Sequence, residues 1–187
     1  MKKVDDAAIL RRFQSGDVSA FQELVRAYQD NIYNLCSYMT GDPVNAEDIA
    51  QDVFLKAYQN LKNFRPNASI YTWLYRIAVN ACIDYKRKAS FESLFRYQQH
   101  NDETIEDEPS DDPSPEHDYE SQQTRNAVRK ALGRLSQKLR AVIVMKEMDG
   151  LSYDEIAQSL DISIGTVKSR ISRARDELKR IMLKKDT

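Results

Sequence analysis

Proline and glycine are scarce, with five of each in 187 residues. A sheet joined by many tight turns would need more of both, and nearly every apolar pattern in the chain has helical spacing. The longest aliphatic run, Ala141 to Met145, is far too short to cross a bilayer, and the charged start MKKVDDAAILRRF has no apolar signal segment. We therefore expect an all-α, soluble, cytoplasmic protein.

Cysteine and histidine are also rare. Cys36 and Cys82 lie far apart, each within a helical apolar pattern that is typical of a small buried thiol. His100 and His117 lie in polar sequence with no cysteine at ligand spacing. The sequence predicts neither a zinc site nor a cofactor.

Basic residues are missing from the middle of the chain. Residues 98–124 carry no Lys or Arg and a charge of −10, whereas residues 125–187 carry +7 and the whole chain only −1. The segment HNDETIEDEPSDDPSPEHDYE has three prolines and too few apolar residues to offset the entropy of an ordered chain. The predicted organisation is an N-terminal helical domain (1–92), a flexible acidic linker (93–121) and a C-terminal helical domain (122–187).

The first domain should contain a short helix near Asp5 to Gln14 and three longer ones. The second helix carries an apolar stripe, and Asp42 with Pro43 provides a cap and first turn for the third. That stripe comprises Phe21, Leu24, Val25, Tyr28, Ile32, Leu35 and Met39.

Two polar faces stand out on this predicted bundle. In VNAEDIAQDVFLKAYQNL, one face of the helix should point inward, which leaves Asp48, Gln51 and Asp52 together outside. The inward face comprises Ala46, Ile49, Ala50, Val53, Ala57 and Leu61. In YTWLYRIAVN, a helical wheel places Arg76 and Asn80 on a polar stripe with Trp73 at its border, and Leu74, Ile77, Ala78 and Ala81 on the core side.

The C-terminal stretch LSYDEIAQSLDISIGTVKSRISRARDELKRIM predicts a helix-turn-helix. Ser152 and Glu155 form a capping box, 161–163 is the turn, and a longer helix starts near Ile164. Asp161 stands where many such turns carry glycine. Arg173 on the outer face can donate two hydrogen bonds to guanine. The outer face that we expect to meet DNA comprises Gly165, Thr166, Lys168, Ser169, Arg170, Ser172 and Arg173.

The motifs NAEDIAQDVFLKAYQNLKNF, YTWLYRIAVNACIDYKRK and LSYDEIAQSLDISIGTVKSRISRAR resemble, in order and spacing, the extracytoplasmic-function sigma factors, which are promoter-specificity subunits of bacterial RNA polymerase. The resemblance implies core-polymerase binding through Asp48, Gln51 and Asp52, minus-thirty-five recognition by the helix-turn-helix, and inhibition by an anti-sigma factor. It also implies contacts to the melted minus-ten strand by Phe64, Arg65, Asn67, Trp73, Arg76, Asn80, Lys86, Arg87 and Lys88.

Other interpretations stay open at this point. A stand-alone helix-turn-helix regulator would need a sensor or phospho-acceptor domain, and a helical nuclease would need a carboxylate or histidine beside Asp48 and Asp52; the sequence offers neither. The acidic linker could be a soluble spacer, a substitute for RNA in a polymerase channel, or an inhibitor of DNA binding by the free protein.

Overall fold

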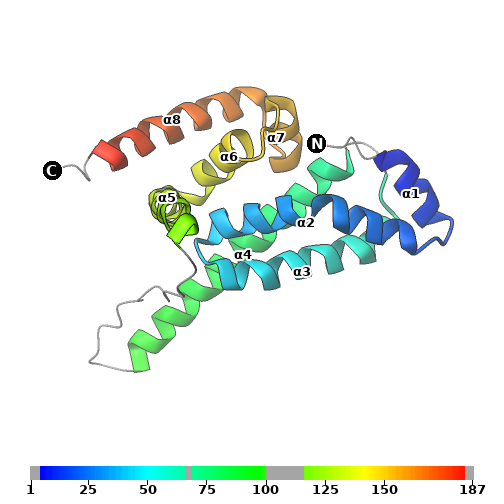
Figure 1. Cartoon of the computed structure of the whole chain (residues 1–187), viewed down its shortest axis with the longest axis horizontal. Helices are drawn as coiled ribbons and strands as arrows, with labels where there is room; N and C mark the ends of the chain where they lie inside the picture. The colour runs from blue at the N-terminus through cyan, green and yellow to red at the C-terminus, as the bar shows by residue number, and fades with distance from the viewer. Residues whose placement is uncertain (1–4, 66–68, 100–115, 184–187) are drawn as a thin grey trace.

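The computed structural model describes residues 5–65, 69–99 and 116–183, except for the side chains of 92–99 and 116–122. The described residues form helices and no strands, which confirms the predicted all-α class (Figure 1). None of these helices is long and apolar enough to cross a membrane. In chain order they are α1 (Asp6–Gln14), α2 (Ser19–Thr40), α3 (Pro43–Leu61), α4 (Ile70–Gln99), α5 (Glu116–Gly133), α6 (Gln137–Glu147), α7 (Tyr153–Leu160) and α8 (Ile164–Leu183).

The helix starts in the N-terminal half follow from local capping. The Asp5 carboxylate accepts a hydrogen bond from the backbone N–H of Ala8 and caps α1. The Asp42 carboxylate accepts from the N–H groups of Val44 and Asn45, as the sequence predicts. Between α2 and α3, Gly41 has φ of 78°, a conformation that glycine adopts without strain.

Apolar stripes of α2, α3 and α4 meet in the core of this half. The inward face predicted for α3 is buried throughout, and most of the α2 stripe is buried, with Phe21 and Val25 half-buried. Phe13 of α1 packs edge-on against Tyr58 of α3, at 5.5 Å between ring centroids. The first helix is thereby fixed to the bundle.

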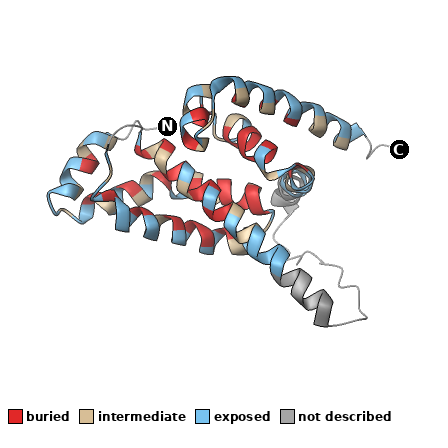
Figure 2. Cartoon of the chain, turned by 180° about the vertical axis from the view of Figure 1, so that it is seen from behind, coloured by how far each residue is buried: buried red, intermediate tan, exposed pale blue. Residues whose placement is uncertain are grey.

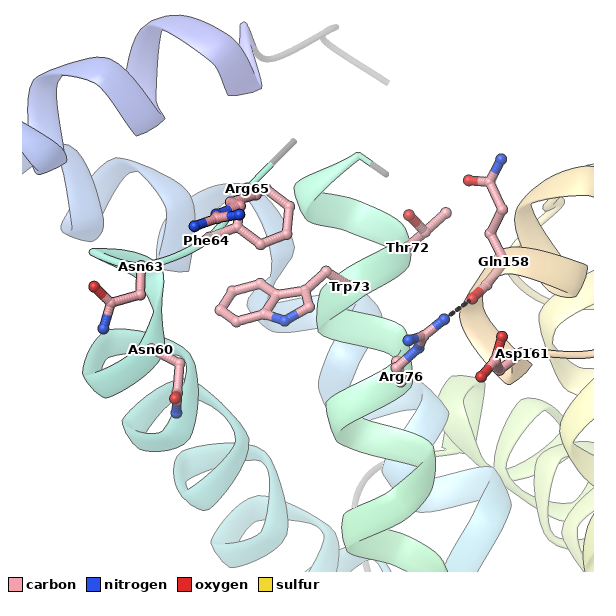
Figure 3. Close-up of a pocket in the computed structure, with 9 residues that line it drawn as sticks. All are labelled: Asn60, Asn63, Phe64, Arg65, Thr72, Trp73, Arg76, Gln158 and Asp161. Carbon is pink, nitrogen blue, oxygen red and sulfur yellow. Dashed lines mark hydrogen bonds between the residues drawn. The ribbon is translucent and has the colours of Figure 1, made fainter. Parts of the chain in front are cut away.

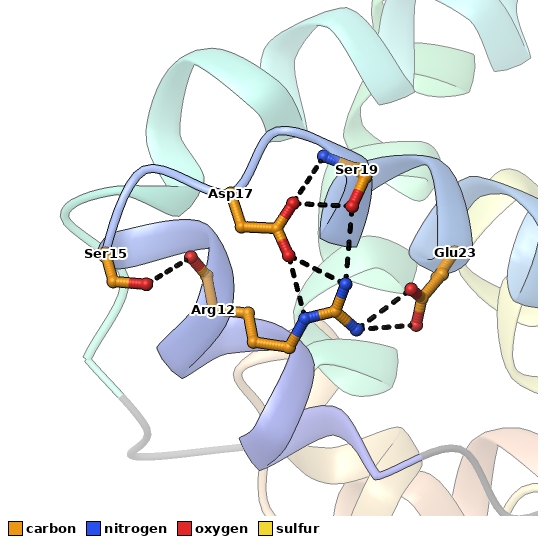
Figure 4. Close-up of polar contacts among 5 residues, drawn as sticks. All are labelled: Arg12, Ser15, Asp17, Ser19 and Glu23. Atoms are coloured by element: carbon orange, nitrogen blue, oxygen red, sulfur yellow. Dashed lines mark hydrogen bonds and ion pairs between the residues drawn. The ribbon is translucent and has the colours of Figure 1, made fainter.

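The corner between α1 and α2 is held by one arginine (Figure 4). Arg12 forms ion pairs with Asp17 at 2.7 Å and Glu23 at 2.8 Å, and its Nη2 donates to the Ser19 hydroxyl. These pairs are exposed to solvent, which screens them, so each contributes little to stability. Their main effect is to fix the direction in which α1 leaves α2.

The C-terminal half contains the predicted helix-turn-helix, formed by α7 and α8. The Ser152 hydroxyl accepts from the N–H of Glu155, whose carboxylate accepts from the N–H of Ser152, so the predicted capping box is confirmed. Ile156, Val167 and Ile171 are buried between the two helices. Asp161 has φ of 54° in the turn, so a carboxylate residue occupies a left-handed position that favours glycine.

The two halves pack directly against each other. α7 lies on α4, and α5 and α6 lie on α2 (Figure 1). Arg140 of α6, only 5% exposed, donates from Nη1 to the Met39 carbonyl at the end of α2. Its other N–H groups donate to the carbonyls of Leu132, Gly133 and Leu135 at the end of α5.

Helices extend into the predicted linker from both sides, since α4 runs to Gln99 and α5 begins at Glu116. Residues 100–115, with most of the acidic tract, lie outside the described residues. The domain boundaries therefore stay a prediction.

Candidate functional site

The outer face of α3 is exposed to solvent and carries mostly polar side chains. Asp48, Gln51 and Asp52 are all exposed on it, as the sequence predicts, and it faces away from the rest of the chain in Figure 2. Helical spacing adds two exposed apolar residues to the same side, Val44 at 75% and Leu55 at 56%. Sequence reasoning missed both, although exposed apolar side chains among carboxylates are typical of a protein contact surface.

A pocket of about 600 Å³ opens where the end of α3 meets the start of α4 (Figure 3). Phe64 and Trp73 form its apolar wall, with ring centroids 4.9 Å apart. Gln14 of α1 supports this wall by donating to the carbonyls of Lys62 and Phe64. The residues that line the pocket are Asn60, Asn63, Phe64, Arg65, Thr72, Trp73, Arg76, Gln158 and Asp161.

The pocket brings together four of the predicted minus-ten residues, Phe64, Arg65, Trp73 and Arg76. Asn80 lies one turn further along α4, exposed, and lines the next hollow together with Trp73. Asn67 lies outside the described residues. We call the pocket and Asn80 the strand pocket.

The three consecutive basic residues near the middle of α4, Lys86 to Lys88, do not share one face of the helix. Lys86 is half-buried beside Arg140 and Asp42, and burial, followed by the Arg140 charge, lowers its pKa. Arg87 is exposed and pairs with Asp84 at 3.0 Å, and Lys88 is exposed. Lys86 thus faces the C-terminal half, whereas Arg87 and Lys88 face solvent.

Sequence reasoning missed two kinds of pocket residue. Asn60 and Asn63 come from the last turn of α3 and the turn after it, where nothing in the sequence distinguishes them from ordinary surface amides. Gln158 and Asp161 come from the other half of the chain, so only the packing of the two halves brings them here.

The outer face of α8 is arranged as the sequence predicts. Gly165, Lys168, Ser169, Ser172 and Arg173 are exposed, and Thr166 and Arg170 are half-exposed. On the opposite side, Val167, Ile171 and Ala174 are buried against α6 and α7. Small residues along an exposed basic helix allow a close approach to the major groove.

The chemistry available at these surfaces is binding chemistry. Aromatic rings can stack on bases, amides can bind base edges, and guanidinium groups can bind phosphates. Among the described residues, no cluster of His, Cys, Asp and Glu is arranged to hold a metal ion. Cys36 and Cys82 are both buried, and contact with Cys82 together with burial raises the pKa of the Cys36 thiol, which makes it a poor nucleophile.

Family models match both halves of the chain. Sigma-70 region 2 matches residues 24–92, and sigma-70 region 4 matches residues 125–178. The first match covers most of α2, all of α3 and most of α4, including the exposed α3 face and the strand-pocket residues that come from α3, α4 and the loop between them. The second covers the helix-turn-helix.

Curated relatives match along nearly the whole chain. The ECF RNA polymerase sigma factor SigW of Bacillus subtilis is 38% identical over 182 residues, covering 91% of this chain and 93% of that protein. The ECF RNA polymerase sigma-E factor of Escherichia coli K12 is 36% identical over 182 residues, covering 95% of this chain and 94% of that protein.

Solved structures are similar over both halves together. CnrH in complex with the cytosolic domain of CnrY has a TM-score of 0.71 at 25% identity, covering 97% of this chain and 99% of that one. The sigma factor RpoE in complex with the anti-sigma factor NepR, from Bartonella quintana, has a TM-score of 0.66 at 26% identity, covering 88% and 98%. With two region models and full-length relatives above 30% identity, this chain belongs to the extracytoplasmic-function (ECF) sigma factors of bacterial RNA polymerase.

Proposed function

We propose that the chain binds core RNA polymerase through the outer face of α3, holds the melted minus-ten strand in the strand pocket and reads the minus-thirty-five element with α8. In this proposal residues 1–92 and 122–187 act as separate domains joined by the acidic linker 93–121. The protein is a non-enzymatic specificity subunit of the cytoplasm. The observation that carries the proposal is the presence of three exposed surfaces of the required chemistry within two matched sigma regions.

The minus-ten assignment rests on the composition of the strand pocket. Trp73 and Phe64 offer aromatic faces, Asn80 offers an amide for a base edge, and Arg65 is an exposed cation at the rim. Lys86, half-buried near Arg140, is less accessible to phosphates than the exposed Arg87 and Lys88.

The free energy needed to open the DNA duplex implies that the chain acts together with the polymerase. Opening about five or six base-pair steps costs about 8 kcal/mol at about 1.4 kcal/mol each. Two or three stacking contacts return about 1–3 kcal/mol each, before the cost of ordering the strand. The isolated chain should therefore not melt duplex DNA.

An anti-sigma factor is the second protein partner that we propose. The sigma factor RpoE, similar to this chain over both halves, was solved with the anti-sigma factor NepR. Between α4 and α6–α8 this chain has a hollow of about 360 Å³ with apolar lining residues, among them Val79, Ile83 and Leu160, which could accept a partner's side chains.

Charge reversal on α3 tests the polymerase surface. Asp52→Arg should abolish co-purification with core RNA polymerase, because the exposed carboxylate contributes to the surface and not to the core. Asp30→Arg, an equal charge change at an exposed position of α2, is the control and should bind normally. Normal binding by a folded Asp52→Arg variant, judged by circular dichroism, would refute the assignment of α3.

A further inference from the structure

The first helix lies outside the matched sigma regions, yet it is bonded to the wall of the strand pocket. The region 2 match starts at residue 24, whereas α1 ends at Gln14. The Gln14 side chain donates from Nε2 to the carbonyls of Lys62 and Phe64, at 3.2 Å in both cases. A side-chain amide nitrogen carries two hydrogens, so one group can hold both carbonyls. Gln14 therefore joins α1 to the segment that carries the aromatic wall.

The end of α1 from which Gln14 projects is itself fixed. Phe13 contacts the rings of Phe21 on α2 and Tyr58 on α3, with centroids 5.8 Å and 5.5 Å away. The ion pairs of Arg12 hold the corner that follows (Figure 4). The Gln14 amide is thus presented from a helix with contacts to both α2 and α3.

The turn after α3 is held locally by backbone hydrogen bonds. The N–H groups of Asn63 and Phe64 donate to the carbonyls of Asn60 and Leu61, each at 3.1 Å. These bonds fix the turn relative to the last residues of α3. The Gln14 bonds add a restraint relative to a different helix.

This restraint acts on the peptide that joins Phe64 to Arg65. The Phe64 carbonyl belongs to that peptide, so its direction determines where both side chains leave the backbone. The Phe64 ring lies 4.9 Å from the Trp73 ring, and Arg65 lies at the rim beside them (Figure 3). A loop that must be ordered when a ligand binds lowers the affinity for that ligand. The Gln14 bonds order this loop before any strand arrives.

We propose that Gln14 is a positioning residue, which holds the Phe64–Arg65 peptide in place and thereby presets the aromatic wall for the melted minus-ten strand. This inference rests on the proposed minus-ten role of the strand pocket. It gives α1 a part in strand capture without any contact with DNA. Without these bonds only a fraction of the molecules has the wall in place, so strand capture slows.

Substitutions at Gln14 can separate hydrogen bonding from other effects. Leucine has no donor, glutamate presents acceptors to the two carbonyls, and lysine has three donors on a longer stem. Gln14 is exposed and all three residues are good helix formers, so the fold should be retained. Ser15 is the matched control, because it is exposed at the same helix end and its hydroxyl bonds within its own turn, to the Arg12 carbonyl.

Promoter opening by the holoenzyme is the main measurement. Core polymerase with each full-length variant is mixed with a promoter fragment that carries 2-aminopurine in the non-template minus-ten strand. Fluorescence reports strand opening, and a mobility shift at low temperature reports binding to the closed duplex. Gln14→Leu should slow opening about fivefold, the scale of one or two lost hydrogen bonds, and leave duplex binding unchanged. Gln14→Glu should be at least as slow, whereas Gln14→Lys and Ser15→Glu should match the wild type.

Trp73 provides a second measurement in the free chain, because it is the single tryptophan and its ring contacts Phe64. Acrylamide should quench its fluorescence more strongly in Gln14→Leu than in the wild type or Gln14→Lys. The unfolding temperatures of the three proteins should be equal, since the Gln14 side chain is exposed. A general loss of stability would instead lower the unfolding temperature of Gln14→Leu.

Phe64→Ala separates the two levels of the proposal. If the Phe64→Ala holoenzyme opens the promoter at the wild-type rate, the minus-ten role of the pocket fails. If Phe64→Ala slows opening but Gln14→Leu does not, or if Gln14→Lys is as slow as Gln14→Leu, the positioning role of Gln14 is refuted.

Discussion

Asp149 is the residue whose environment depends most on the contact between the two halves. It follows α6 and faces Tyr75 of α4, a fully buried residue whose hydroxyl accepts a hydrogen bond from Tyr71 at 3.1 Å. Burial raises the pKa of Asp149 to about 7, although the Tyr75 hydroxyl partly opposes this. Its Oδ2 atom has no hydrogen-bond partner among the described residues.

This environment predicts that closure, the packing of the two halves against each other, depends on pH. An open chain should return the pKa of Asp149 to about 3.9, so closing takes up a proton between pH 4 and 7. Closure is therefore strongest at low pH, weakens by up to about tenfold per unit as pH rises through this window, and is constant above it. The facing tyrosines stay neutral, because burial raises the pKa of Tyr71 to about 12 and that of Tyr75 further.

Fluorescence energy transfer can measure this dependence. Dyes on cysteines introduced at exposed Glu47 and Lys179 report the distance between the halves, since native Cys36 and Cys82 are buried. Efficiency should be higher at pH 5.5 than at pH 7.5 in the wild type and nearly equal in Asp149→Asn. Glu155, which acts on Tyr71, is the other carboxylate near this cluster, so Glu155→Gln is the control and should keep the wild-type dependence. A pH profile shared by Asp149→Asn and the wild type would contradict the account.

In α8, the residues that stabilise the fold and the residues expected to bind DNA lie on opposite faces of the helix. Its inner residues Val167, Ile171 and Ala174 are buried, while Lys168 and Arg173, the proposed DNA contacts, are exposed. A substitution on the outer face should therefore change DNA binding and not the fold.

Arg173→Ala should cost about 1–3 kcal/mol of affinity at one minus-thirty-five position and relax base preference there. Lys168→Ala should weaken binding about equally for all sequences, because a phosphate contact carries no base information. Binding of the polymerase complex to a set of single-base promoter variants measures both. If Arg173→Ala leaves the base preference unchanged, Arg173 does not take part in base recognition.

Helices and their polar faces could be predicted from the sequence because the signals are local. Asp42 with Pro43, the Ser152–Glu155 box and the apolar period of α3 depend only on neighbours along the chain. The same period placed Arg76 and Asn80 on an exposed face.

Contacts between the halves could not be predicted in this way. Val79 is 2% exposed and lines the hollow beside the helix-turn-helix, Tyr75 is buried against Asp149, and Arg140 reaches the end of α2. Each depends on residues more than 50 positions apart, which no helical period connects. The contribution of Gln158 and Asp161 to the strand pocket was missed for the same reason.

The whole chain is closed in this structure, with its two halves packed against each other. The closed arrangement exposes the α3 face for polymerase while α7 covers part of the strand pocket.

The central claim is that this chain gives core RNA polymerase its promoter specificity. It is tested most directly by transcribing genomic DNA fragments in vitro with core polymerase, with and without the protein, and mapping the transcript 5′ ends. With the protein present, new 5′ ends should appear that share two upstream sequence elements at a fixed spacing, and Asp52→Arg should abolish them. Identical 5′ ends with and without the protein would contradict it.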